Sequence, residues 1–204
     1  MPTVRQLCLI TTIAAASVVA APIASAQSMP TKGYLCCNLW TASAWADDGN
    51  KHDPSKQPLA VGTPVIPLTF AGNQLKFEAH GQQYTLANQY STGLAPDQFV
   101  GRWVVSWDPR RRLAGMPAVV QKEIRAGRVM RGMTRTQVAM ALGFPTATNT
   151  PRLDVGEWKY LPYSGYEFLV LFDDRGNVRG VQSDDANTRA AMYSPTPVPQ
   201  PVAK

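Results

Sequence analysis

The sequence is poor in the residues on which catalysis and metal binding most often depend. It has two histidines and three cysteines among 204 residues. His52 and His80 lie in separate polar turn segments, and no cysteine pair has the CxxC spacing of a zinc or redox motif. The chain also lacks a GxSxG nucleophile elbow and a glycine-rich phosphate loop. We therefore expect no catalytic residue, no metal, no cofactor and no enzymatic activity.

The chain also has only a small excess of positive over negative charge. The net charge is +6, and only 17% of the residues are charged. The basic residues gather locally only around Arg110, Arg111 and Arg112. A nucleic-acid-binding domain would have a stronger and more clustered positive charge, so we expect no nucleic-acid partner. An anionic lipid headgroup or an acidic protein face suits a short basic stretch better.

Long hydrophobic runs are absent after residue 26, and a bilayer span needs roughly 18 or more apolar residues. At the N-terminus, Arg5 precedes an apolar run that is followed by the small residues Ala24-Ser25-Ala26. This pattern predicts a secretory signal peptide over residues 1–26, with Gln27 as the first mature residue. We expect a periplasmic protein that is not integral to the membrane, with outer-membrane association as one option.

The cysteines do not indicate a lipoprotein. Cys8 lies inside the apolar region, and Cys36 lies well past the predicted cleavage site. In an oxidising compartment, Cys36 and Cys37 could form a disulfide with each other, pair between chains, or stay reduced and buried. Adjacent side chains point to opposite faces of a strand, which argues against an easy bond between them. They are candidates for a disulfide or redox pair, and a structural role is favoured.

Residues 27–110 have the pattern of a small β module. Tight turns separate residues 62–70, 74–79 and 82–90, and alternate residues of 74–79 are apolar, as in a strand with one buried face. This spacing predicts hairpins in a small antiparallel sheet or an SH3-like barrel, which residues 103–109 could close.

Residues 111–184 indicate an α+β domain. A helix is predicted from Pro117 to about Gly127, and a second one lies within "GMTRTQVAMALGFP", residues 132–145. In this second helix Thr134 and Gln137 have the spacing of a capping box, and Gly143 is placed for a left-handed C′ position.

Three predicted strands follow, over residues 157–161, 166–172 and 178–182. The order predicts an antiparallel sheet with helices on one face. Residues 185–204 contain alternating prolines and are predicted to be a disordered tail.

The run "VMRGMTRTQVAMALGFPTATN", followed by "EWKY" and "FDDRGNV", resembles the SmpA/OmlA family of BamE-like outer-membrane assembly factors over residues 119–181, about a third of the chain. The resemblance implies a C-terminal two-layer ααβββ domain, of the BamE/BLIP-like kind, that acts as an adaptor in the envelope. It also implies an interaction surface at the end of the second helix, at Leu142, Phe144 and Pro145.

Together these observations predict a non-enzymatic, exported scaffold or adaptor. Its partners would be envelope proteins or anionic lipid headgroups, and its role would be to support outer-membrane protein assembly or envelope integrity. The candidate interaction surface comprises Leu142, Phe144, Pro145, Arg110, Arg111 and Arg112. The alternatives are an SH3-like protein that binds peptidoglycan and, third, an unrecognised periplasmic hydrolase.

Overall fold

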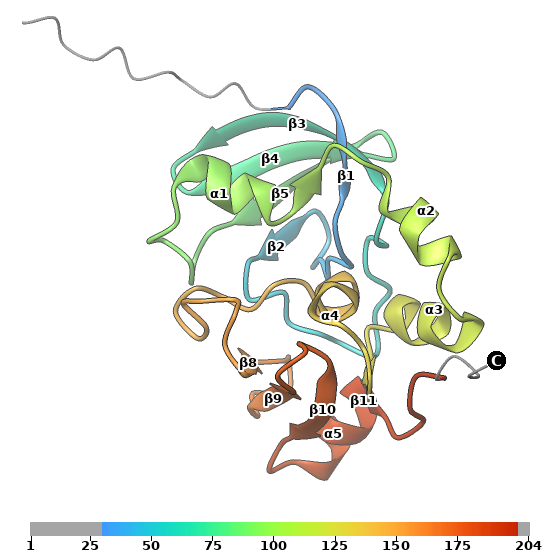
Figure 1. Ribbon diagram of the computed structural model, residues 1–204. Helices are drawn as coiled ribbons and strands as arrows, with labels where there is room; N and C mark the ends of the chain where they lie inside the picture. The colour runs from blue at the N-terminus through green and yellow to red at the C-terminus, as the bar shows by residue number, and fades with distance from the viewer. Residues whose placement is uncertain (1–29, 200–204) are drawn as a thin grey trace, which may run out of the picture.

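The computed structural model describes residues 30–199, which form a mixed α+β fold with a curled, mostly antiparallel sheet and five helices (Figure 1). The strands are β1 (Gly33–Leu35), β2 (Trp45–Asp47), β3 (Pro64–Ala71), β4 (Gln74–Ala79), β5 (Gln82–Ala87), β6 (Val104–Val105), β7 (Val129–Met130), β8 (Glu157–Tyr160), β9 (Phe168–Phe172), β10 (Val178–Gln182) and β11 (Tyr193–Ser194). The helices are α1 (Pro96–Gly101), α2 (Pro109–Ala114), α3 (Ala118–Arg125), α4 (Arg135–Leu142) and α5 (Ala186–Met192). Within this described range, no helix has both the length and the apolar character needed to cross a bilayer. The predicted signal peptide, residues 1–26, lies outside the described residues.

The N-terminal half builds a six-stranded sheet with the order β2-β5-β4-β3-β1-β6. The strands predicted over 62–70, 74–79 and 82–90 are confirmed as β3, β4 and β5. Strand β6 comes from the segment predicted to close the sheet, and it pairs with β1. The prediction of a purely antiparallel module is wrong in one place, because β2 runs parallel to β5.

Helix α1 was not predicted, and it completes the core of this sheet. Phe99 and Val100 of α1 are buried and pack in one cluster with Leu35, Phe77 and Leu86 of the strands. Pro96 begins the helix, where a proline costs no hydrogen bond. The helix covers one face of the sheet and so removes the apolar residues of that face from water.

Helix α4 begins as the sequence predicts. The backbone N–H of Gln137 donates to Thr134 Oγ1 at 3.3 Å, and the N–H of Thr134 donates to Gln137 Oε1 at 2.8 Å, which confirms the capping box. Val138 and Ala141 are fully buried. Figure 1 shows α4 almost end-on between the two large sheets, so that protein covers it on more than one side.

The three predicted C-terminal strands are confirmed as β8, β9 and β10, in the antiparallel order β10-β9-β8. The central strand β9 is the most apolar one, and its residues Phe168 and Val170 are fully buried. They share a hydrophobic core with Val138 of α4 and Trp158 of β8. Such a short helix would not persist alone in water, and this core stabilises it.

Helix α4 ends at Gly143, but not in the predicted left-handed conformation. Gly143 has φ 80° and ψ 177°, whereas a left-handed residue has ψ near +47°. This extended region at positive φ is open essentially to glycine alone. A Cβ at Gly143 would also lie 2.7 Å from Asn50 Nδ2. Glycine is therefore needed here to turn the chain sharply away from the helix next to a buried side chain.

The prediction of a disordered tail over residues 185–204 is wrong for its first part. Residues 186–192 form α5, and β11 pairs in parallel with β7. Asp185 caps the helix, because its Oδ1 accepts a hydrogen bond from Thr188 N at 2.6 Å, and Met192 is buried in the C-terminal core. The alternating prolines that follow the helix are typical of a disordered segment, so the capping residue Asp185 was not recognised as the start of a helix. Residues 200–204 lie outside the described residues.

The two halves are joined by a buried polar contact between asparagines and helix ends. Asn38 Nδ2 donates to the carbonyls of Ile124 and Ala141, at 2.6 and 3.1 Å. Asn50 Nδ2 donates to the carbonyl of Leu142 at 2.8 Å. The last four carbonyls of a helix have no partner within it, so these side chains satisfy the carbonyls of Ala141 and Leu142, which would otherwise be buried without a hydrogen bond, and add a second donor to that of Ile124. The C-terminal ends of α3 and α4 therefore depend on residues of the N-terminal half.

Cys36 and Cys37 form a disulfide with each other. They lie in bends directly after β1, so the alternation of side chains along a strand does not apply to them. Cys37 is fully buried, and Cys36 is 8% exposed. Both belong to the core cluster of the N-terminal half, which fits a structural role.

Candidate partner-binding surface

The structure separates the residues of the predicted interaction surface into two groups. Leu142 is 2% exposed and Pro145 is buried, so neither can meet a partner, and their assignment to the surface is wrong. Leu142 packs in the hydrophobic core of the C-terminal half, and the carbonyl of Pro145 accepts a hydrogen bond from Arg102 Nη1 of the N-terminal half at 3.1 Å. Phe144 is half-buried, and Arg110, Arg111 and Arg112 are exposed on α2.

An apolar pocket of about 270 Å³ lies where the two halves meet. One wall comes from the N-terminal half and includes Cys36 and Val105. The other comes from α4 and the segment that follows it, where Phe144 and Trp158 lie with their ring centroids 6.2 Å apart. The full lining is Cys36, Gly101, Val105, Trp107, Arg135, Thr136, Ala139, Met140, Phe144, Leu153 and Trp158.

Arg135 stands in the wall of this pocket and is held in place by its own contacts. Its Nη2 donates to the carbonyl of Val155 at 2.8 Å, and its guanidinium lies 4.6 Å from the ring centroid of Phe172. These contacts hold the guanidinium of Arg135 against Phe172, while its Nε is buried without a hydrogen-bond partner among the described residues.

A second, more open pocket of about 510 Å³ lies on the neighbouring surface, and basic side chains line it. It is formed by Tyr34, Ser106, Trp107, Asp108, Arg111 and Arg112. Arg111 and Arg112 form no ion pair with any residue in the described range 30–199. Their positive charge therefore faces solvent.

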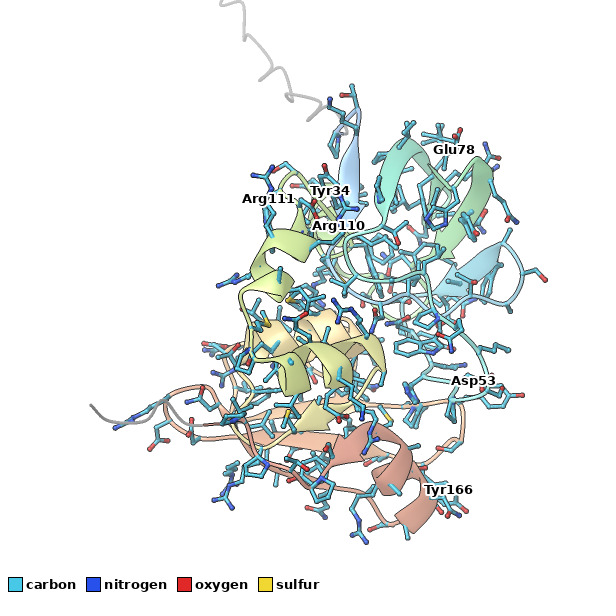
Figure 2. The ribbon with its side chains drawn as sticks, turned by 90° about the vertical axis from the view of Figure 1, so that its right-hand side faces the viewer. Tyr34, Asp53, Glu78, Arg110, Arg111 and Tyr166 are labelled. Atoms are coloured by element: carbon cyan, nitrogen blue, oxygen red, sulfur yellow. A yellow bond between two sulfur atoms is a disulfide. The ribbon has the colours of Figure 1, made fainter. Side chains whose placement is uncertain are left out.

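Arg110 has a different role from the two arginines after it. Its guanidinium binds the carboxylate of Asp108 through both oxygens, with Nη2 to Oδ2 at 2.7 Å, and it lies 5.5 Å from the ring centroid of Tyr34. Figure 2 shows Arg110 and Tyr34 side by side, with Arg111 close to them. The hydrogen bonds from Arg110 lower the pKa of Asp108, which also caps α2. This pairing stabilises the start of α2. Among the described residues, Arg111 and Arg112 are the two arginines of α2 that form no ion pair.

Trp107 lines both pockets and is 45% exposed. It lies in the short link between β6 and α2, where Asp108 and Pro109 set the start of the helix directly after it. We call the two pockets, together with Trp107, the Trp107 surface. Large exposed aromatic side chains next to arginine are typical of the residues that contribute most to protein interfaces.

The two histidines do not come together. His52 is buried, its ring centroid lies 4.7 Å from that of Trp40, and it hydrogen-bonds the backbone of Ala126. Burial lowers the pKa of His52, and the positive charge of Arg128 acts in the same direction. His80 is in the turn between β4 and β5, at φ 52°. Among residues 30–199, no group of three His, Cys, Asp or Glu side chains is arranged to hold a metal ion.

The large aromatic residues divide between core packing and the surface. Trp40 and Trp103 are buried, whereas Trp45 is exposed like Trp107. Tyr163 and Tyr166 are also exposed. Sequence reasoning did not find Tyr34, Met140 or Leu153 as lining residues, because only the packing of the two halves brings them to the same surface. No protein-family model, curated protein or solved structure matches this chain.

Proposed function

We propose that this protein is an exported, non-enzymatic adaptor of the bacterial envelope, and that it binds another envelope protein through the Trp107 surface. The observation that carries the proposal is the position of Trp107 between an apolar pocket and a pocket with two unpaired arginines. An aromatic anchor flanked by cations is suited to binding, and the acid that lines this surface within residues 30–199, Asp108, is paired with Arg110.

The partner segment that fits this surface is acidic and carries one large apolar side chain. The apolar pocket, at about 270 Å³, is somewhat smaller than the roughly 300–1,000 Å³ that enclose a whole small ligand. It suits one large side chain, whose burial would contribute about 1.5–3 kcal/mol. The planar guanidinium groups of Arg111 and Arg112 can each bind a carboxylate through two hydrogen bonds.

The size of the apolar pocket favours a protein over a lipid. An acyl chain would need a long apolar channel, whereas this pocket of about 270 Å³ is short and is lined by Phe144 and Trp158. An anionic headgroup on Arg111 and Arg112 would keep its acyl chains in the bilayer and leave the apolar pocket unused. A protein segment can place one side chain in the pocket and its carboxylates on the arginines.

The C-terminal half supports the same proposal. We propose that α3, α4 and β8 to β10 correspond to the ααβββ unit of the SmpA/OmlA family, in which adaptor function in the outer-membrane assembly machinery is expected. The predicted signal peptide is consistent with a periplasmic site of action. The mature protein would present the Trp107 surface to a partner in that compartment.

Chemical cross-linking in living cells tests the proposal. Cells producing the wild-type protein, Trp107→Ala, or the double variant Arg111→Glu/Arg112→Glu are cross-linked, and the products are purified and identified by mass spectrometry. We expect one envelope protein to be captured by the wild type and lost from both variants. Tyr166→Ala is the matched control, because Tyr166 is 53% exposed and lies outside both pockets. Equal capture by all four proteins would contradict the proposal.

A further inference from the structure

A second groove lies away from the Trp107 surface. It consists of two adjoining cavities of about 210 and 280 Å³, which share Asp53 and Tyr163. Figure 2 shows Asp53 at the opposite edge of the molecule from Arg111. Together the two cavities reach the size range of sites that enclose a small ligand.

Two exposed aromatic side chains line this groove. Trp45, in β2, is 39% exposed, and Tyr163, in the segment between β8 and β9, is 69% exposed. Exposing such large aromatic rings is unfavourable unless something covers them, and flat apolar rings beside polar groups are typical of recognition sites. Trp40 closes the inner side of the same cavity.

The charged groups of the cavity that Trp45 lines balance one another, and Asp185 adds one acid in the adjoining cavity, where it caps α5. Lys56 Nζ lies 3.1 Å from Asp53 Oδ2 and 5.6 Å from the ring centroid of Tyr163. Asp47 and Lys51 also line the cavity as one acid and one base. Partial burial raises the pKa of Asp47, and the positive charge of Lys51 acts against this rise. With two acids and two bases on this wall, a ligand of high net charge of either sign gains little.

The adjoining cavity adds uncharged hydrogen-bonding groups. Thr188 Oγ1 donates to Ser164 Oγ at 2.7 Å, which leaves the hydroxyl hydrogen of Ser164 for another acceptor. Asn187 contributes an exposed side-chain amide to the same cavity. The groove thus has aromatic side chains in one cavity, and hydroxyl and amide side chains in the adjoining one.

From this combination we infer that the groove between residues 40–56 and residues 162–192 binds a neutral saccharide. The faces of a sugar ring carry C–H groups that pack on aromatic rings, while its hydroxyl and acetamido groups exchange hydrogen bonds with carboxylate, amide and hydroxyl side chains. With three acids and two lysines along the whole groove, the near balance of charge gives little attraction to a strongly acidic or strongly basic ligand. This site shares no residue with the Trp107 surface and goes beyond the proposed adaptor function.

The test uses two neutral oligosaccharides as probes, chitotetraose, which carries acetamido groups, and cellotetraose, which does not. Binding to the mature protein is measured by isothermal titration calorimetry and by intrinsic tryptophan fluorescence. The variants are Trp45→Ala and Tyr163→Ala, with Tyr166→Ala and Trp107→Ala as matched aromatic controls outside the groove. Trp45 and Tyr163 are exposed, so their truncation should leave the fold intact, which the thermal unfolding midpoint checks.

We expect at least one probe to bind with a dissociation constant in the range of about 10 µM to 1 mM, with affinity about tenfold or more lower in Trp45→Ala and Tyr163→Ala. The affinity should be unchanged in the two controls. Failure of both probes to bind at millimolar concentration would overturn the inference, as would equal affinity in all variants. Loss of saccharide binding in Trp45→Ala with partner capture intact would separate this site from the adaptor function.

Discussion

Asn38 Nδ2 donates a hydrogen bond to the main-chain carbonyl of Ala141, 3.1 Å away and 103 residues later in the chain. Both groups are fully buried, and the same side chain also binds Ile124 and Val61. One asparagine thus completes the ends of two helices and holds the N-terminal half against the C-terminal half. The apolar pocket of the Trp107 surface lies at this same junction, so its shape depends on the contact.

Replacement of this side chain should destabilise the whole protein. Asn38→Ala leaves the carbonyl of Ala141 and the N–H of Val61 without partners, and each such buried group costs about 1–3 kcal/mol. The carbonyl of Ile124 loses one of its two donors, because the N–H of Gly127 still bonds it at 3.0 Å. We expect a loss of about 3 kcal/mol or more in the free energy of unfolding, measured by urea denaturation. Asn187→Ala, at an exposed site, should change it by less than about 0.5 kcal/mol. Two separate transitions, with only one shifted by Asn38→Ala, would show that the halves are not coupled in this way.

Gly127 is the tightest point of a second contact between the halves. Its φ is +66°, and a Cβ there would lie 2.4 Å from a ring carbon of Trp40 and 2.8 Å from one of His52. Gly127→Ala should therefore cost about 2–4 kcal/mol, from backbone strain and overpacking together. Gly101→Ala is the control, because nothing lies within 4 Å of its added carbon in α1. A thermal midpoint of Gly127→Ala equal to that of the wild type would contradict the packing described for Trp40.

His52 should make stability fall in weakly acidic solution. Its pKa is lowered in the folded protein by burial, so the unfolded chain, with an ordinary pKa near 6.5, takes up a proton first. The unfolded state then binds more protons, and the free energy of unfolding decreases as the pH falls from about 6.5 towards the folded pKa. One proton of difference sets an upper limit of about 1.4 kcal/mol per pH unit on the slope in that window. His52→Gln should flatten this part of the profile, measured by urea denaturation, and an unchanged slope would exclude His52 as its source.

The disulfide predicts the chemical state of the purified protein. With Cys36 bonded to Cys37, iodoacetamide should leave both sulfurs unmodified until a reductant is added, as seen by mass spectrometry of the peptide that contains them. The protein should also run as a monomer on a non-reducing gel. Alkylation of both cysteines without reduction, or a reductant-sensitive dimer, would point to one of the other two states that the sequence allows.

Local signals predicted most of the fold. The capping box of Thr134 and Gln137, and the alternation along β4, depend on residues close in sequence, so they can be recognised in a single chain. Helix α5 was missed because it is short and the prolines from Pro195 onward dominate the composition of the segment that contains it. The sharp turn at Gly143 depends on its approach to Asn50, a residue far away in sequence, and could not be predicted.

Only part of the candidate site could be predicted from the sequence. The exposed basic residues Arg111 and Arg112 could be identified from their local clustering. Leu142 and Pro145 could not be excluded, because their burial depends on tertiary packing and not on neighbours close in sequence. The proximity of Phe144 to Trp107 likewise depends on how α4 packs under the N-terminal sheet, which is a long-range property.

The central claim is that Trp107 joins an apolar and a basic pocket into one surface that binds an acidic, apolar-anchored protein segment. Placing the photo-reactive amino acid benzoylphenylalanine at position 107 in living cells tests it most directly, with position 166 as the control. Mass spectrometry of the cross-linked product then identifies the captured segment. We predict a protein cross-link at position 107 and not at 166, within a segment that has a large apolar residue and a net negative charge. Cross-links only to lipid, cross-links to a basic segment, or equal yields at both positions would contradict it.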